Sequence, residues 1–207
     1  MANHGVVPAS LASRTRGVIE PVAKALVRMG VGANAVTVVG FLITVAGAAV
    51  LALGSPLPAL GLLIVGTLSD ALDGQVARAS GGGTRAGAFL DSTLDRLADA
   101  ALAVSAVVLG IRESNPILIG AGLAALIASF LVSYVRARAE ALGLRGNTGA
   151  APREARIVLF LVGVAVWGLT GNGRFFELAV IAIAVLATLT FADRVTSVLA
   201  ALRKEGN

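Results

Sequence analysis

The sequence predicts an all-α integral membrane protein with six transmembrane helices, preceded by an N-terminal amphipathic helix in the membrane interface. Three observations predict this fold: an excess of apolar residues, six long apolar segments separated by turn signals, and basic residues concentrated in alternate connections. Of the 207 residues, 57% are hydrophobic and only 14% are charged. Soluble domains carry roughly 25% charged residues, so the excess of apolar residues indicates a lipid bilayer as solvent.

The composition also excludes several classes of protein. The chain has no cysteine, which excludes a disulfide framework, thiolate chemistry and cysteine-based metal sites. The net charge of +5 could indicate a nucleic-acid partner, but aromatic residues make up only 4% and are not interleaved with the basic ones. We therefore expect no nucleic-acid partner and attribute the basic residues to orientation in the membrane.

Residues 1–33 are expected to form a tail and a juxtamembrane helix, and residues 34–207 a six-helix transmembrane domain. From Ala9 to Val31 apolar and basic residues alternate at helical spacing. The apolar side holds Val18, Ile19, Val22, Leu26 and Val27, and the basic side holds Arg14, Arg16, Lys24 and Arg28. Such a helix lies in the interface with its basic side toward anionic headgroups; an ordinary surface helix is the alternative.

Six segments have the length and apolarity of membrane spans, which need about 20 residues. They are residues 34–53, 57–79, 86–110, 116–141, 156–169 and 175–199, and glycine, proline or asparagine turn signals separate them. The fifth is the weakest because it is short and charged residues open its first turn. An even number of spans places both termini on the same side.

Basic residues are distributed very unevenly among the connections. The alternate connections hold only Arg112 and Arg174, whereas all other Lys and Arg residues flank the N-terminal segment, the loop after the second span, the region after the fourth span and the C-terminal tail, apart from Arg96 within the third span. Because basic loops stay on the cytoplasmic side, we expect a multi-pass protein of the cell inner (cytoplasmic) membrane with both termini in the cytoplasm.

Acidic residues are concentrated where a membrane protein can least tolerate them. Five of the twelve lie in the second and third expected spans, at Asp70, Asp73, Asp91, Asp95 and Asp99. Each would cost at least about 2.5–3.5 kcal/mol in a helix facing lipid. Spacings of i,i+3 and i,i+4 place each of the first two pairs on one helix face, and a short turn makes the helices antiparallel neighbours. The two pairs can therefore converge near the cytoplasmic end.

Converging carboxylates need positive charge to stay ionised together. Oxygen ligands of this kind suit Mg²⁺ or Mn²⁺, which predicts a metal site of Asp70, Asp73, Asp91 and Asp95. The alternative is neutralisation by Arg78, Arg85 and Arg96, although two well-placed arginines do not balance four acids. Asp99 lies beside Arg96 and could equally be a salt-bridge partner, so it is left outside the site.

One continuous motif runs from Asp70 to Asp95. It reads D-x2-D-G-x2-A-R-x8-G-x3-D-x3-D, with eight defined residues at fixed spacings. This motif resembles the signature of the CDP-alcohol phosphotransferase family, and the six-span architecture and interfacial helix also resemble that family. The resemblance therefore covers nearly the whole chain.

The resemblance implies a role for each of these residues. Asp70, Asp73 and Asp91 would hold two divalent ions, Mg²⁺ or Mn²⁺, with Asp95 as the catalytic base that also touches a metal. The site for the CDP-linked lipid would comprise Asn34, Thr37, Asp70, Gly74, Ala77, Arg78 and Thr84. The family often has a proline before the asparagine, where this chain has Ala33.

By the same resemblance the activity would be transfer of a phosphatidyl group from CDP-diacylglycerol to a small polar alcohol, with release of CMP. Arginines at the end of the fourth span and the start of the fifth indicate an anionic, phosphorylated polyol acceptor, although membrane anchoring alone would also explain them. This stretch looks like bacterial phosphatidylinositol-phosphate synthases, in which Arg136, Arg156 and Arg194 would hold the phosphate of inositol phosphate. Lysine is common at position 136 in that subfamily, and Arg-Pro-Glu-Arg is common at positions 153–156, where this chain has Arg-Glu-Ala-Arg.

Several alternatives stay open. Glycerol-3-phosphate would need a similar anion site, which would make the chain a phosphatidylglycerophosphate synthase. A divalent-metal transporter would also bury acids, but it should distribute them through the membrane depth, and spans four to six hold only Glu140, Glu177 and Asp193. The family commonly forms homodimers, so a homodimer is expected, although no segment specifies its interface.

Overall fold

The computed structural model describes residues 20–144, 149 and 151–205, and every regular element among them is a helix. A short helix over residues 20–28 precedes six long ones. These are α2 (Ala33–Ala52), α3 (Pro56–Ala79), α4 (Arg85–Arg112), α5 (Pro116–Ala141), α6 (Arg153–Thr170) and α7 (Arg174–Glu205). They coincide with the six expected apolar segments, except that α6 begins earlier, at Arg153, and α7 continues past residue 199 to Glu205.

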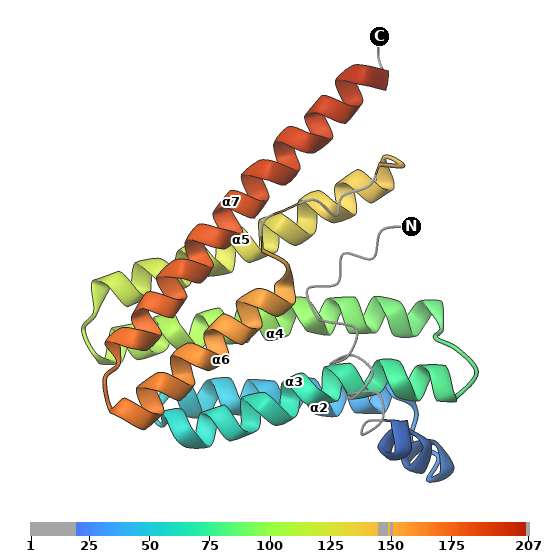
Figure 1. Ribbon diagram of the computed structural model, residues 1–207, viewed down its shortest axis with the longest axis horizontal. Coiled ribbons are helices and arrows are strands. Elements are labelled where there is room, and N and C mark those ends of the chain that lie inside the picture. Colours follow the sequence, from blue (N-terminus) through green and yellow to red (C-terminus); the bar gives the residue numbers. More distant parts are fainter. Residues whose placement is uncertain (1–19, 145–148, 150, 206–207) are drawn as a thin grey trace.

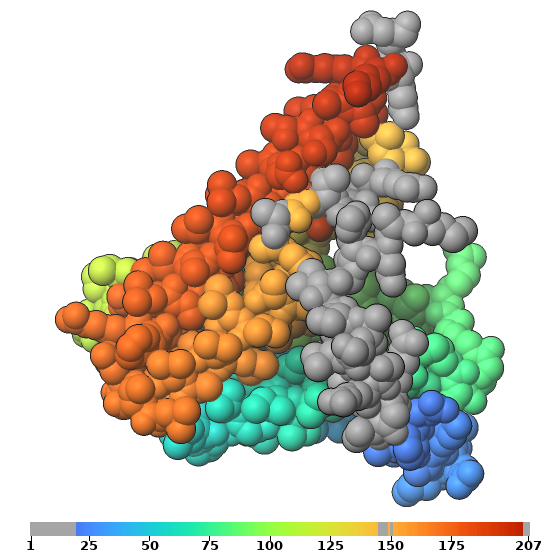
Figure 2. All heavy atoms as spheres, viewed as in Figure 1, coloured from blue at the N-terminus to red at the C-terminus, as the bar shows by residue number. Residues whose placement is uncertain are grey.

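The six long helices form a bundle in which consecutive helices run in opposite directions (Figure 1). Helix α2 packs against α3 and α4, α4 against α5, and α5 against α7, while α6 packs against both α7 and α3. The α2–α3, α4–α5 and α6–α7 turns lie at one end, and the α3–α4 turn and the helix over residues 20–28 lie at the other (Figure 1). Along one flank the side chains of α6 and α7 form a continuous surface (Figure 2).

Four helices among the described residues are long and apolar enough to cross a membrane: α2, α3, α5 and Arg174–Lys204 of α7. Many large apolar side chains face outward, such as Leu42, Leu68 and Leu189, each more than half exposed. In water such exposure would be costly, whereas lipid tails solvate it. The chain is therefore an all-helical membrane protein. Helices α4 and α6 fall outside this group, and three charged residues occupy the first turn of α6.

The predicted N-terminal helix is present over its described part, and residues 9–19 of the prediction lie outside the described residues. Ala23 is buried, and Leu26 and Val27 pack with Val36 of α2 and Val76 of α3. On the other side Lys24 is exposed and pairs with Glu20 at 2.6 Å. Part of the predicted apolar side therefore packs on the bundle, whereas Val22 of that side is 49% exposed; the position of this helix in the membrane interface stays a prediction.

The apolar core fills the end of the bundle away from the α3–α4 turn. Phe176 at the start of α7 is fully buried. It meets the ring of Phe160 edge-on at 5.2 Å and stacks on Trp167 at 5.7 Å. At the same end Asn115 caps α5 by accepting hydrogen bonds from the Ile117 and Leu118 amides. This packing leaves the polar residues of α3 and α4 to gather at the opposite end.

Candidate metal and substrate site

Three carboxylates from two helices meet near the α3–α4 turn. Asp70 on α3 and Asp91 and Asp95 on α4 each offer one oxygen to a group whose atoms all lie within 4.8 Å of one another. The turn between the helices is tight because Gly81 and Gly82 adopt φ values of +95° and +118°, which L side chains rarely tolerate. Because α3 and α4 both pack on α2, this turn brings the acids of one motif together at the same end of the bundle.

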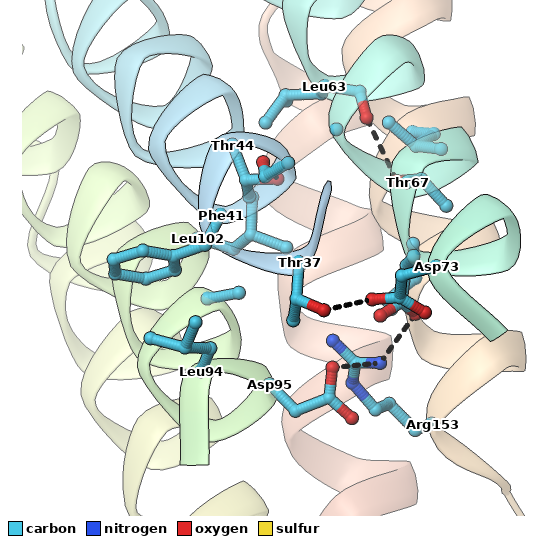
Figure 3. Close-up of a pocket in the computed structure, with 16 residues that line it drawn as sticks. Thr37, Phe41, Thr44, Leu63, Thr67, Asp73, Leu94, Asp95, Leu102 and Arg153 are labelled. Carbon is cyan, nitrogen blue, oxygen red and sulfur yellow. Dashed lines mark hydrogen bonds and ion pairs between the residues drawn. The ribbon is translucent and has the colours of Figure 1, made fainter. Parts of the chain in front are cut away.

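The fourth predicted ligand, Asp73, lies outside this trio of oxygens. Its side chain is buried, and it accepts a 2.7 Å hydrogen bond from the Thr37 hydroxyl of α2 (Figure 3). Thr37 lies in the second turn of α2, and its hydroxyl also lies within hydrogen-bond distance, 3.0 Å, of the Ala33 carbonyl, to which it can donate. Two residues that were predicted for different ligands, a metal and a diphosphate, are thus joined directly.

Arg153 lies among the acids, a contact that the sequence analysis missed. Its Nη1 lies 2.8 Å from an Asp95 oxygen (Figure 3). The same Nη1 lies 3.2 Å from an Asp70 oxygen, and Nε of Arg153 lies 2.9 Å from an Asp99 oxygen. Of the arginines considered as neutralising partners, Arg96 lies 3.6 Å from Asp95 and 3.9 Å from Asp99. Arg78 instead donates a hydrogen bond to the Gln75 side chain. Asp99 is therefore a salt-bridge partner, as one of the two interpretations of it held.

The donor set fits a divalent cation. All the candidate ligand atoms are carboxylate oxygens, which hard divalent ions prefer. Asp70 keeps 40% of its side chain exposed, so an ion could reach the trio from the aqueous end of the bundle. Asp70, Asp73 and Asp95 also line a pocket between α2, α3, α4 and α6, together with apolar residues such as Phe41 and Leu102 (Figure 3). The pocket therefore combines charged and apolar side chains.

Most residues predicted for the CDP-linked lipid lie around the same end. A Cβ placed on Gly87 would come within 2.9 Å of the Asn34 side-chain oxygen and 3.1 Å of the Thr84 hydroxyl, so these two side chains lie together over a glycine. Thr84 caps α4 by accepting from the Gly87 amide at 3.0 Å. On α3, Gly74 lies beside the Arg78 guanidinium, 3.7 Å from an ideal Cβ, and Ala77 is half-buried next to it in sequence.

The three arginines predicted for the acceptor come from three helices. Arg136 on α5 is exposed and pairs with Glu140 at 2.8 Å. Arg156 on α6 is buried and donates to the Ala151 carbonyl at 2.9 Å, and Arg194 on α7 donates to the Val132 carbonyl of α5 at 2.9 Å. Arg194 is close enough to Arg136 and Arg156 for their positive charges to repel it. Like charges gathered in this way are typical of an anion site.

The fold and the site together define a membrane-embedded enzyme that uses divalent metal. Residues 31–194 match the family model described as CDP-alcohol phosphatidyltransferase, and the chain belongs to this family. The enzymatic prediction is thereby confirmed, and the transporter hypothesis loses its support.

Named relatives narrow the comparison. The chain is 41% identical over 153 residues to the phosphatidylinositol phosphate synthase of Mycobacterium marinum, which covers 72% of this chain and 64% of that protein. It is 38% identical over 179 residues to the archaetidylinositol phosphate synthase of Methanothermobacter thermautotrophicus, covering 86% of this chain and 87% of the relative.

Solved structures agree with these relatives. The crystal structure of the Mycobacterium tuberculosis phosphatidylinositol phosphate synthase with CDP-DAG bound has a TM-score of 0.81 and 33% identity, covering 87% of this chain and 93% of that chain. A second structure of the same synthase, in complex with manganese and citrate, also has a TM-score of 0.81 and covers 87% of this chain and 88% of that chain. The manganese in that relative and the acid trio in this chain both indicate a divalent metal.

Proposed function

We propose that this chain is a phosphatidylinositol-phosphate synthase, which transfers the phosphatidyl group of CDP-diacylglycerol to inositol phosphate and releases CMP. The observation that carries a phosphorylated acceptor is the gathering of Arg136, Arg156 and Arg194 from three helices. The relatives support inositol phosphate as the acceptor, because both are named as synthases of an inositol phosphate lipid. The solved relative with CDP-DAG bound supports the donor.

Asp70, Asp73 and Asp91, together with Asp95, are the proposed ligands of two divalent ions, Mg²⁺ or Mn²⁺. Such ions, when bound, offset negative charge on a diphosphate and on the departing CMP. Asp95 is the proposed base because it is the last aspartate of the family motif, and its carboxylate lies 2.8 Å from Nη1 of Arg153 at the start of α6. There it would accept the proton of the acceptor hydroxyl, which attacks the β-phosphorus. General bases of this kind contribute about 10²–10⁴-fold to rate.

The donor is proposed to lie across the pocket between α2, α3, α4 and α6. Its cytidine diphosphate would contact Asn34, Thr37, Gly74, Ala77, Arg78 and Thr84, which lie around the same end of the bundle as the aspartates. Its acyl chains would lie against the apolar residues that line the pocket, such as Phe41 and Leu102. Small residues at 74 and 77 leave the α3 backbone open to a bulky ligand.

The acceptor phosphate is proposed to bind the three arginines. Arg156 is already fixed by the Ala151 carbonyl and Arg194 by the Val132 carbonyl. An incoming phosphate would therefore meet guanidinium groups that lose little side-chain entropy on binding. Charge-assisted hydrogen bonds from arginine to phosphate are roughly twice as strong as neutral ones. Glycerol-3-phosphate is the second candidate, since the same phosphate contact would serve it.

All six long helices are proposed to cross the membrane, with residues 34–207 as the transmembrane domain. Helix α4 has 28 residues and would extend about 42 Å at 1.5 Å per residue, enough to span. Arg112 and Arg174 lie near the end of the bundle that holds the α2–α3, α4–α5 and α6–α7 turns. The aspartates of the site and most described basic residues lie near the other end, which we assign to the cytoplasm. The homodimer and the location in the inner membrane stay predictions.

The decisive experiment offers a panel of acceptors to the purified protein. The full chain in detergent or liposomes is supplied with CDP-diacylglycerol and Mn²⁺, then with inositol phosphate, glycerol-3-phosphate, serine or free inositol. CMP release and the mass of the lipid product are measured. We expect product with inositol phosphate and little with free inositol. A product formed equally from free inositol would contradict a phosphate-binding role of the arginines, and a product from glycerol-3-phosphate alone would select the second candidate.

A further inference from the structure

The position of Arg153 gives the acid cluster a positive charge of its own. Arg153 is the first residue of α6 and follows Pro152. Its side chain is 19% exposed, and its guanidinium contacts one carboxylate of α3 and two of α4. A half-buried arginine that contacts three acids from two other helices cross-links these helices, because loss of the arginine would leave Asp95 and Asp99, which are 20% and 11% exposed, without this partner.

The two ends of this guanidinium contact different kinds of acid. Nη1 lies between Asp70 and Asp95, both members of the trio that offers ligand oxygens within 4.8 Å. Nε contacts Asp99, which lies outside that trio. Arg153 therefore shares two carboxylates with any divalent ion bound by the trio, while it keeps an independent partner in Asp99.

We propose that Arg153 is a positioning residue that holds Asp70 and Asp95 together when the metal site is empty and gives up these oxygens when divalent ions bind. The inference rests on the proposed metal site. Nε stays on Asp99 throughout, so the side chain pivots instead of leaving. A guanidinium has no lone pair for a metal and repels it, so the two cations compete for the same oxygens.

This exchange, in which divalent ions replace Arg153 at the oxygens of Asp70 and Asp95, would also affect the acceptor site. Arg156 lies one helical turn after Arg153 and is held by the Ala151 carbonyl. A pivot of Arg153 would change the restraint on the start of α6 and thereby the position of Arg156. Metal binding and acceptor binding would then be coupled through the first turn of one helix, in both directions.

Binding of Mn²⁺ to the full-length protein tests the exchange without depending on turnover. Free Mn²⁺ is measured by electron paramagnetic resonance for the wild type, Arg153→Gln, Arg153→Lys and a control, Arg203→Gln, which removes the same charge from the exposed end of α7. We expect Arg153→Gln to bind Mn²⁺ roughly tenfold more tightly, within the 5–150-fold range usual for coupled sites. Arg153→Lys keeps the competing charge and should stay near the wild type, as should Arg203→Gln.

Unchanged or weaker Mn²⁺ binding in Arg153→Gln would overturn the exchange, since an arginine that only orients ligands would weaken binding when it is lost. Thermal unfolding provides the second measurement: Mn²⁺ should raise the melting temperature more in Arg153→Gln than in the wild type. If the wild type bound no Mn²⁺, the exchange and the metal site would fail together. If Mn²⁺ bound as expected but no inositol phosphate lipid formed, only the proposed acceptor would fail.

A distance measurement tests the pivot itself. Because the chain has no cysteine, spin labels can be attached at two introduced cysteines, Glu154→Cys on α6 and Ser92→Cys on α4, both exposed positions. We expect saturating Mg²⁺ to shift the distance between them in the otherwise wild-type chain and to leave it fixed when Arg153→Gln is added. An identical distance with and without Mg²⁺ in both proteins would contradict a coupling through α6.

Discussion

The close contact between α2 and α3 should be unusually sensitive to a single methyl group at Gly66. A Cβ at this position would lie 2.2 Å from the Thr44 hydroxyl and 3.2 Å from the Gly40 carbonyl. Rotation of Thr44 could relieve the first contact, but the second is with backbone. Gly66→Ala must therefore push the two helices apart.

The size of the effect follows from two opposing contributions. Overpacking of this kind costs about 1–3 kcal/mol, whereas alanine favours a helix over glycine by about 1 kcal/mol. We expect a net loss of about 1–2 kcal/mol in the free energy of unfolding. Turnover should fall too, because Asp70 and Asp73 lie one and two turns further along α3, and separation of the helices would lengthen the 2.7 Å contact between Thr37 and Asp73.

Gly61 on the same helix provides a matched control, because a Cβ there would meet nothing within 4 Å. Gly61→Ala should be neutral or slightly stabilising and leave CMP release unchanged. Reversible unfolding in mixed detergent micelles gives the free energies of unfolding. The double variant Thr44→Ala/Gly66→Ala should be more stable, by at least about 0.5 kcal/mol, than the sum of the two single effects predicts. Equal behaviour of Gly66→Ala and Gly61→Ala would refute the argument from helix spacing.

Three further predictions concern the chemistry of the site. Asp95→Asn should reduce turnover by about 10²–10⁴-fold while CDP-diacylglycerol still binds in a calorimetric titration; near-normal turnover would exclude it as the base. Arg136→Gln should raise KM for inositol phosphate about tenfold, equivalent to about 1.4 kcal/mol, with KM for the donor unchanged. Arg138→Gln, on a different face of α5, should alter neither constant. Chelation with EDTA should abolish CMP release and added Mn²⁺ or Mg²⁺ should restore it; activity that persists in EDTA would contradict the metal site.

Much of this architecture could be predicted from local pattern. Apolar runs and turn residues located all six helices, because each has its own sequence of about 18–32 residues and needs no distant partner to be identified. Likewise the i,i+3 and i,i+4 spacings, with a glycine turn between the helices, were enough to predict that Asp70, Asp91 and Asp95 converge.

Contacts between distant helices could not be predicted in the same way. Nothing in the spacing of residues around Arg153 shows that α6 packs against α3, so its contact with Asp70, 83 positions away, had no local signal. The pairing of Thr37 with Asp73 is similar. One clue was present: Asp99 continues the i,i+4 series of Asp91 and Asp95, and a fifth acid on this face called for a further cation.

The two helices that fall outside the apolar group are the two that supply Asp91, Asp95 and Arg153. Their charge is what lowers their apolarity, and it faces other helices instead of lipid: Arg153 from α6 is paired with Asp95 and Asp99 from α4. An acid left in lipid would cost at least about 2.5–3.5 kcal/mol, so neither helix would be stable in the membrane without its partners. The residues needed for metal chemistry therefore also make α3, α4 and α6 depend on one another for insertion, and a variant that removes Arg153 should weaken the fold most when no divalent ion replaces its charge.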